Sequence, residues 1–290
     1  MLILENELLA RHGYWRVGGP LERLVLVENL ADLRALPRVD HVLGNGSNLL
    51  VPDVGLRGVT VRLGGALREV EIIKEDGNEV TIRVGGGLLN SVLLQRLEKL
   101  DLGGLGCLAG VPGTMGGAVA MNAGTALGEI AERLVAVEGI DGTRLRRDQL
   151  DMSYREGNLP QGFVVVAAEL RVGRSQRAAE REQVRNHLAR RRATQPLDLP
   201  SCGSVFRNPP GDHAGRLIEA AGLKGWRCGA AEISERHGNF IVNRGGATAH
   251  DVMTCIHAAW SEVRLRTSIA LVPEVHVLGD WPAALWPLSG

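Results

Sequence analysis

Aromatic side chains are scarce in this chain of 290 residues, where phenylalanine, tryptophan and tyrosine together make up 3%. The 33 basic and 33 acidic residues leave no formal net charge. Proteins that bind nucleic acid or anionic membranes usually carry a basic surplus, and single-stranded nucleic acids stack on aromatic side chains. We therefore expect neither nucleic acid nor a membrane as a partner.

Cysteine is rare, and long apolar runs are missing. The four cysteines are far apart and form no Cys-x-x-Cys pair: Cys107, Cys202, Cys228 and Cys255. This spacing favours reduced thiols over a disulfide framework or a metal site. No apolar run has membrane-spanning length, and charged residues interrupt the N-terminal apolar segment, unlike a signal peptide. We expect a cytoplasmic protein without a bound metal, and since nothing in the sequence requires a second subunit, a monomer.

Glycine is plentiful instead, with 38 residues, and it is concentrated in two segments predicted to be loops: Leu43–Leu50 and Ala109–Gly124. Glycine allows the backbone to approach a ligand closely or to adopt a positive φ, and backbone N–H groups in such loops bind anions. Two such loops predict a dinucleotide-sized cofactor held by main-chain groups. Two connecting loops without a ligand remain an alternative. A Rossmann fold is disfavoured, because Gly44-x-Gly46 lacks the third glycine and no helical pattern follows directly.

Apolar periodicity predicts mixed strands and helices in an α+β arrangement. Helices are expected at 31–36, 88–100, 175–192, from about 214, and after 248; strands are expected at 23–27, 59–63, 70–73, 80–84, 134–140, 163–172, 240–242 and 274–278. Thr194–Pro200 contains two prolines and predicts a hinge into a smaller lobe. Thr248 and Asp251 have the spacing of a capping box at the start of the last helix.

Short motifs recur in a fixed order along nearly the whole chain. They are Val17–Pro20, Leu43–Val51, Ala109–Gly117 with Met121–Gly124, Tyr154-Arg155, Pro200–Pro209, Leu217–Glu219 with Gly222–Gly225, His237–Asn243, and Pro273-Glu274. This ordered set resembles the UDP-N-acetylenolpyruvoylglucosamine reductase family, in particular its short subclass without an extra tyrosine-bearing loop. Two departures stand out: Gly157 replaces the serine of the family's Tyr-Arg-x-Ser, and His12-Gly13-Tyr14 replaces a threonine-rich approach to the first glycine pair.

The resemblance implies a vanillyl-alcohol-oxidase-like (PCMH-type) FAD-binding fold with a smaller α+β substrate-binding domain. It implies two FAD-binding subdomains, at 1–63 and 64–193, with 275–290 returning to the first of them, and a substrate-binding domain at 194–274. The implied reaction takes a hydride from NADPH to FAD and then to the enolpyruvyl group of a UDP-sugar. The product would be UDP-N-acetylmuramate, a precursor of peptidoglycan.

Three residues match the family's catalytic positions. Ser204 would donate the proton to carbon, while Arg155 and Glu274 would stabilise the enolate-like intermediate. Without the resemblance, each has an ordinary interpretation. Ser204 would be a turn hydroxyl, Arg155 a surface arginine and Glu274 an edge-strand charge.

The resemblance also implies binding residues. For the cofactor they are Gly44, Asn45, Gly46, Ser47, Asn48, Leu49, Gly110, Pro112, Gly113, Gly116, Gly117, Asn122, Ala123 and Gly124. For the UDP-sugar they are Arg191, Arg192, Arg207, Lys224 and Asn239, with His237 and Asn243 as further contacts. Two alternatives stay open: another FAD oxidase or dehydrogenase of the same fold, or a non-catalytic nucleotide-binding module.

Overall fold

The structure is a computed structural model that describes residues 1–286, without the side chains of residues 175–177 and 179. The chain forms two compact units. Unit 1 comprises Met1–Leu4, Arg23–Asn45 and Gly58–Arg190, and unit 2 comprises Glu5–Glu22, Gly46–Arg57 and the chain from Arg191 onward. Of the predicted C-terminal return at 275–290, residues 287–290 lie outside the described part of the chain.

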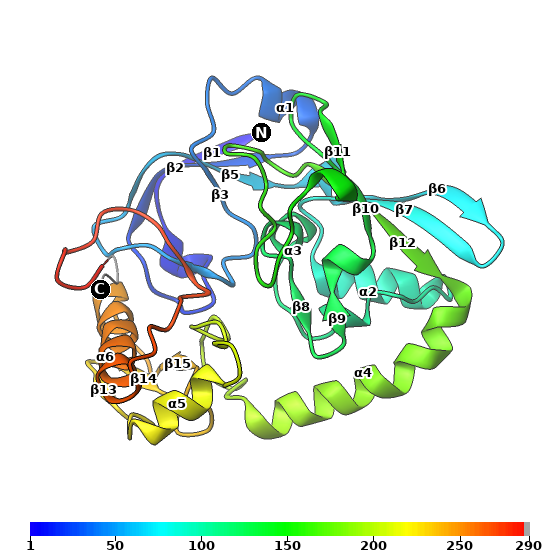
Figure 1. The fold of residues 1–290 in the computed structure, drawn as a ribbon. Helices are drawn as coiled ribbons and strands as arrows, with labels where there is room; N and C mark the ends of the chain where they lie inside the picture. The colour runs from blue at the N-terminus through cyan, green and yellow to red at the C-terminus, as the bar shows by residue number, and fades with distance from the viewer. Residues whose placement is uncertain (287–290) are drawn as a thin grey trace. The chain divides into compact units, whose positions relative to one another are not determined.

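Unit 1 contains a five-stranded sheet in the order β11-β10-β12-β7-β6 (Figure 1). Its strands are β6 (Val70–Asp76), β7 (Glu79–Gly85), β10 (Leu134–Glu138), β11 (Arg144–Arg146) and β12 (Ala167–Gly173). In β7, Val80, Ile82 and Val84 are fully buried, which is the alternation expected of a strand with one face in the core. Leu93 and Leu97, one turn apart on α2 (Asn90–Lys99), belong to the same core.

The second glycine-rich segment differs from the expected loop, because it contains the short helix α3 (Met115–Ala120). Thr114 begins this helix by accepting a hydrogen bond from Gly117 N at 3.4 Å. Glycine weakens helices, but Met115, Ala118 and Val119 are buried, and α3 contacts β7 and β12. Tertiary packing therefore overrides the local preference.

The other elements of residues 1–194 are a second sheet, a few short helices, strands and turns, and one long helix. A second sheet has the order β1-β2-β5-β3, with β1 (Leu2–Leu8), β2 (Pro20–Val27), β3 (His41–Val42) and β5 (Leu56–Leu63). Others are α1 (Leu30–Arg34), β8 (Gly124–Thr125), β9 (Gly128–Glu129), α4 (Arg174–Thr194) and the 3-10 turns η1 (Leu9–Arg11), η2 (Gly65–Arg68), η3 (Gly106–Leu108), η4 (Ile130–Glu132) and η5 (Arg147–Gln149). Asn29 caps α1 by accepting from Asp32 N. Glu180 ties α4 to unit 1 by accepting from Gly104 N at 2.8 Å and Gly106 N at 3.0 Å.

Unit 2 is built around α6 (Ala249–Thr267), which packs on a small sheet and on α5 (Figure 1). The sheet has the order β13-β14-β15, and the elements are α5 (Ala214–Ala220), β13 (Arg227–Cys228), β14 (Ala231–Ile233) and β15 (Ile241–Asn243). The predicted capping box at Thr248 and Asp251 is present. Asp53 strengthens the same helix start by accepting from Ala249 N at 2.8 Å and His250 N at 2.9 Å. This aspartate lies soon after the first glycine-rich loop and so anchors the chain there.

The predicted final strand at 274–278 is shorter in the structure, where β16 covers His276–Val277. It pairs in parallel with β4 (Leu49–Leu50), which is the end of the first glycine-rich segment. Within residues 1–286, no helix combines the length and apolar character needed to span a bilayer. The same residues contain no cluster of three or more His, Cys, Asp or Glu side chains suited to a metal ion.

Candidate active site

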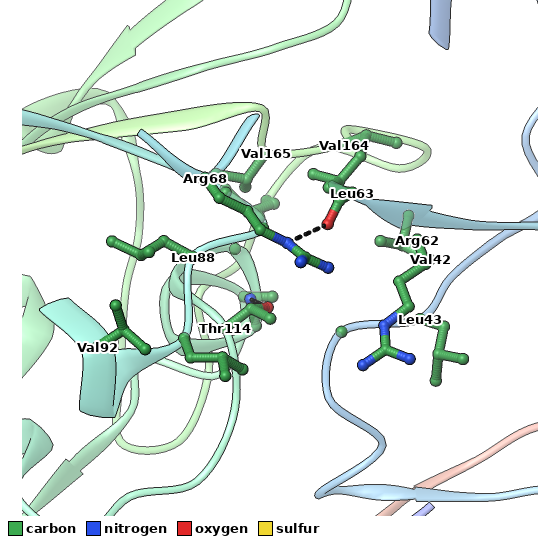
Figure 2. Close-up of a pocket in the computed structure, with 18 of the residues that line it drawn as sticks. Val42, Leu43, Arg62, Leu63, Arg68, Leu88, Val92, Thr114, Val164 and Val165 are labelled. Atoms are coloured by element: carbon green, nitrogen blue, oxygen red, sulfur yellow. Dashed lines mark hydrogen bonds between the residues drawn. The ribbon is translucent and has the colours of Figure 1, made fainter. Parts of the chain in front are cut away.

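The two glycine-rich segments meet at one cavity of about 370 Å³ in unit 1. Gly44 lines it from the first segment, and Gly116 and Gly117 line it from the second. A Cβ placed on Gly44 would lie 2.9 Å from Thr114 Oγ1, so the Thr114 side chain lies close against the backbone of Gly44. Figure 2 shows most of the lining. Its remaining members are Val42, Leu43, Arg62, Leu63, Arg68, Gly86, Gly87, Leu88, Leu89, Val92, Arg96, Thr114, Ala120, Leu159, Phe163, Val164 and Val165.

Gly116 and Gly117 contribute to the cavity in different ways. A Cβ on Gly116 would lie 3.1 Å from Gly86 O and 3.3 Å from Val165 O, so the backbone of Gly116 is tightly packed against these carbonyls. A Cβ on Gly117 would meet only Thr114 Oγ1, at 3.6 Å, and residue 117 is exposed. The cavity therefore has a bare backbone wall at Gly117, which fits the close approach of a flat ligand such as FAD.

A third glycine run, Gly85–Gly87, was missed in the sequence although three consecutive glycines mark it. Gly86 and Gly87 line the cavity. A Cβ on Gly87 would lie 2.5 Å from Leu63 O, and one on Gly86 would collide with Val165 O. These glycines let the end of β7 pass against neighbouring backbone and so shape the cavity wall.

The other predicted cofactor residues of unit 1 do not line this cavity. Gly110 and Gly113 have φ values of +72° and +127°, which favour glycine. Asn122 is 1% exposed, and its side chain bonds Glu129 Oε2 at 2.7 Å, Ser153 O at 2.8 Å and Ala131 N at 3.2 Å. The Asn122 amide therefore holds the segment Ala109–Gly124 in place. The other predicted cofactor residues of this segment are Pro112, Ala123 and Gly124.

Arg155 also lies in unit 1, beside this segment. Its side chain is 17% exposed, its Nη1 is 3.8 Å from Glu129 Oε1, and its guanidinium stacks 4.8 Å from the centre of the Tyr154 ring. Arg155 adopts a φ of +60°, unusual for a residue with a side chain. Gly157 N bonds Ala120 O at 3.0 Å, and a Cβ on Gly157 would collide with Val119 O. This contact explains why the chain has glycine there.

In unit 2 the segment carrying Ser204 runs between two other pieces of chain. Ser204 pairs with Phe240 and Phe206 pairs with Pro273, both antiparallel. Glu274 N donates to Val205 O at 2.8 Å, so the backbones of Ser204 and Glu274 are neighbours. Ser204 is half-buried, and its hydroxyl has no hydrogen-bond partner among the described residues.

Asn239 fixes this segment through its side chain. Its Oδ1 accepts from Phe206 N at 2.9 Å and its Nδ2 donates to Phe206 O at 2.7 Å, while Asn239 O accepts from Val205 N at 2.9 Å. The side chain is 3% exposed, so these buried bonds occupy the amide. Asn243, at 5% exposed, is similarly engaged with Trp15 O, Gly245 N and Ala247 N. Both asparagines thus have a structural task that their motif did not reveal.

The first glycine-rich loop reaches the same neighbourhood of unit 2. Asn48 Nδ2 donates to Glu274 O at 3.0 Å, and His276 N donates to Asn48 O at 3.0 Å. Leu49 lies in β4 opposite His276. Gly46 has a φ of +63°, and its carbonyl accepts from Tyr14 N at 2.9 Å, while Ser47 is half-buried. A predicted cofactor residue and a predicted catalytic residue are therefore directly bonded.

The predicted UDP-sugar contacts are spread over unit 2. Arg191 is half-buried, donates to Gln195 Oε1 at 2.9 Å, and has its pKa lowered by burial, whereas Arg192 is exposed. Arg207 N bonds Val272 O at 2.9 Å. Lys224 Nζ is 3.3 Å from Glu219 Oε1, and burial, together with the charge of Lys224, lowers the pKa of His237.

Comparison with known proteins defines the class first. The family model "FAD binding domain" matches residues 25–143, and the model "UDP-N-acetylenolpyruvoylglucosamine reductase, C-terminal domain" matches residues 195–278. The chain is therefore an FAD-dependent oxidoreductase, and the predicted α+β fold with an FAD-binding part is confirmed.

The particular family follows from near-full-length relatives. The chain is 45% identical to UDP-N-acetylenolpyruvoylglucosamine reductase of Alkalilimnicola ehrlichii, over 94% of either chain, and 43% identical to that of Moorella thermoacetica, over 96% and 94%. The crystal structure of the Thermus caldophilus enzyme (MurB) superimposes with a TM-score of 0.83 at 38% identity, covering 97% of this chain and 100% of that one. The chain belongs to the UDP-N-acetylenolpyruvoylglucosamine reductase family, as the motifs predicted.

Gly117→Leu tests the bare wall of the cavity. We expect the affinity for FAD to fall by about tenfold or more, since overfilling a packed site costs about 1–3 kcal/mol. Flavin absorbance of the purified protein measures the bound fraction, and Gly117→Ala should lose less. Because a side chain here meets little protein, thermal unfolding of the apoproteins should stay similar. Normal flavin content in Gly117→Leu would remove this glycine from the cofactor site.

Asn239→Leu tests the two hydrogen bonds by which the Asn239 side chain holds Phe206, in the segment that carries Ser204. The exchange keeps the side-chain volume but leaves the buried N–H and C=O of Phe206 without partners. We expect the free energy of unfolding to fall by about 2–4 kcal/mol, measured by urea denaturation. Asn78→Leu, at an exposed turn, is the control. Equal stability of Asn239→Leu and wild type would contradict a stabilising role of these hydrogen bonds.

Proposed function

We propose that the protein reduces UDP-N-acetylenolpyruvoylglucosamine to UDP-N-acetylmuramate, with FAD as cofactor and NADPH as hydride donor. The supporting observation is the match along 94% of the chain to a curated relative of that name at 45% identity. The cavity with its backbone wall at Gly117 fits the FAD requirement. We further propose the cytoplasm as its location and peptidoglycan precursor synthesis as its role.

The chain's own residues have distinct tasks in this proposal. Bound flavin supplies hydride transfer between the nicotinamide and the enolpyruvyl group. Arrival of hydride at the vinyl carbon leaves negative charge on the adjacent carbon and its carboxylate. The planar, permanently charged guanidinium of Arg155 suits that carboxylate, and its contacts with Glu129 and Tyr154 orient it.

The intermediate then needs a proton on carbon, which we assign to the Ser204 hydroxyl. The bonds from Glu274 N to Val205 O and from Asn239 to Phe206 hold the serine's segment on both sides. Since Glu274 is a backbone neighbour of that segment, its carboxyl is placed to assist the serine and return a proton to it. The enolate is basic enough to accept a proton from a serine.

The domain roles follow as proposals. We assign FAD binding to 1–63 and 64–193 and the UDP-sugar to 194–274, with Arg191, Arg192, Arg207 and Lys224 as candidates for its phosphates. Pairing of β16 with β4 supports the return of the chain from residue 275 to the first of these parts. A different oxidase reaction of the same fold is the alternative, and the segment Gly203–Arg207 favours the reductase.

Ser204→Ala should separate the two halves of the reaction. In stopped-flow absorbance, NADPH should bleach the flavin of wild type and variant alike. Reoxidation by enolpyruvyl-UDP-N-acetylglucosamine should then be fast in wild type and slowed by about 10²-fold or more in the variant, the typical contribution of a positioned acid.

Ser201→Ala, at a half-buried serine three residues earlier, is the matched control and should behave as wild type. Unchanged reoxidation in Ser204→Ala would withdraw Ser204 from proton transfer. A wild-type flavoprotein whose reduced form does not react with the enolpyruvyl sugar at all would overturn the proposed function itself.

A further inference from the structure

Two of the four cysteines lie on neighbouring elements of unit 2. Cys228 is the last residue of β13, and Cys255 lies in the second turn of α6. The strand contacts the helix directly (Figure 1). All four cysteines are free thiols in the structure. The proposed reaction uses neither Cys228 nor Cys255, so any chemistry of this pair is additional to it.

The pairing of β13 with β14 turns the Cys228 side chain toward α6. Cys228 stands directly opposite Ala231 in this antiparallel pair, and residues directly opposite each other project from the same face of a sheet. Ala231 is fully buried in the hydrophobic core that also contains Cys255, and Cys228 packs against that core. The two cysteines therefore reach one core, Cys228 from the sheet and Cys255 from the helix.

Asp251 marks the position of the Cys228 thiol along α6. Cys228 Sγ lies 3.9 Å from Asp251 Oδ1. Cys255 follows Asp251 by four residues, which places both side chains on the same helix face. A Cβ on Gly229 would lie 2.5 Å from Asp251 Oδ2, so the hairpin backbone next to Cys228 lies against this carboxylate. The Cys228 thiol therefore lies over the helix face that carries Cys255.

The two thiols differ in their access to solvent. Cys228 is half-buried and precedes an exposed glycine in the hairpin turn, whereas Cys255 is fully buried. Burial raises the pKa of the Cys255 thiol to about 12, although a hydrogen bond to the Cys228 backbone lowers it in part. This hydrogen bond also places the Cys255 thiol next to Cys228. Because reaction with a dissolved oxidant requires access, Cys228 is the thiol that reacts first.

We propose that Cys228 and Cys255 form a reversible disulfide when they meet a disulfide oxidant such as oxidised glutathione. Cys228, as its thiolate, attacks one sulfur of the oxidant, which forms a mixed disulfide and releases one glutathione thiolate. Cys255 then loses its proton to solvent and attacks the Cys228 sulfur, which releases the second glutathione thiolate. The two cysteines are oxidised, one glutathione disulfide is reduced to two thiols, and solvent carries the two protons to them. The new bond fastens the β13–β14 hairpin to α6.

Incubation of the purified holoprotein with oxidised glutathione tests the proposal. After removal of the oxidant and unfolding, we expect the free thiols, titrated colorimetrically, to fall from four to two. Mass spectrometry should find the peptides of Cys228 and Cys255 linked, with a mass lower than their sum by two hydrogen atoms. Closing this loop in the unfolded chain should raise the midpoint of thermal unfolding by about 5–10 °C. Dithiothreitol should reverse all of these changes.

Cys228→Ser and Cys107→Ser are the matched variants. Cys107 is a buried cysteine of unit 1, so Cys107→Ser should still form the disulfide and show the same rise in midpoint. Cys228→Ser should show neither the linked peptide nor the rise. Each variant is compared with its own reduced form, so a loss of stability caused by the substitution itself cancels.

Several outcomes would overturn the proposal. They are four remaining thiols in the treated wild type, a link between other cysteines, and a Cys228 that stays as the glutathione mixed disulfide. An unchanged or lowered midpoint would also overturn it, because the bond would then not fasten the hairpin to the helix. The experiment needs neither NADPH nor the enolpyruvyl sugar, so its result is independent of the proposed function.

Discussion

Close contact between glycine backbone and neighbouring backbone is the constraint on which the cofactor-binding unit depends. Gly86 against Val165 and Gly87 against Leu63 leave no space for a Cβ, and Gly116 is tightly packed against Gly86. These contacts set the end of β7 beside α3 and leave a cavity whose wall at Gly117 is bare. The arginines among the lining residues then provide the charge that the wall lacks. Shape and charge at this site therefore come from different parts of the sequence.

In unit 2, asparagine side chains form hydrogen bonds to backbone groups that a neighbouring strand would otherwise bind. Asn239 bonds both backbone groups of Phe206, and Asn48 bonds the carbonyl of Glu274. These side-chain hydrogen bonds fix the position of irregular segments that are too short to form a regular sheet. The backbones of Ser204 and Glu274 are thereby held next to each other, although neither residue lies in a regular strand. Rigid placement of reacting groups is what proton transfer requires.

Much of the architecture could be predicted because its signals are local. The cap at Asn29, the capping box at Thr248 and the apolar alternation of β7 depend on neighbouring residues, and the structure contains all three. The helix α3 could not be predicted, since its stability comes from burial of Met115 and Val119 rather than from propensity. Nor could the contacts of Arg62 and Asn239, whose partners Asn45 and Phe206 are set by the fold. The catalytic assignments to Arg155, Ser204 and Glu274 stay predictions carried by the family resemblance.

The glycine at position 157 limits how this enzyme can be recombined with its relatives. Its backbone lies against the carbonyls of Val119 and Ala120, where the serine usual in the family would not fit. A chimera that imports the Tyr154–Gly157 loop from a serine-bearing relative must therefore import the end of α3 with it. The two segments form one unit of exchange, although more than thirty residues separate them in the chain.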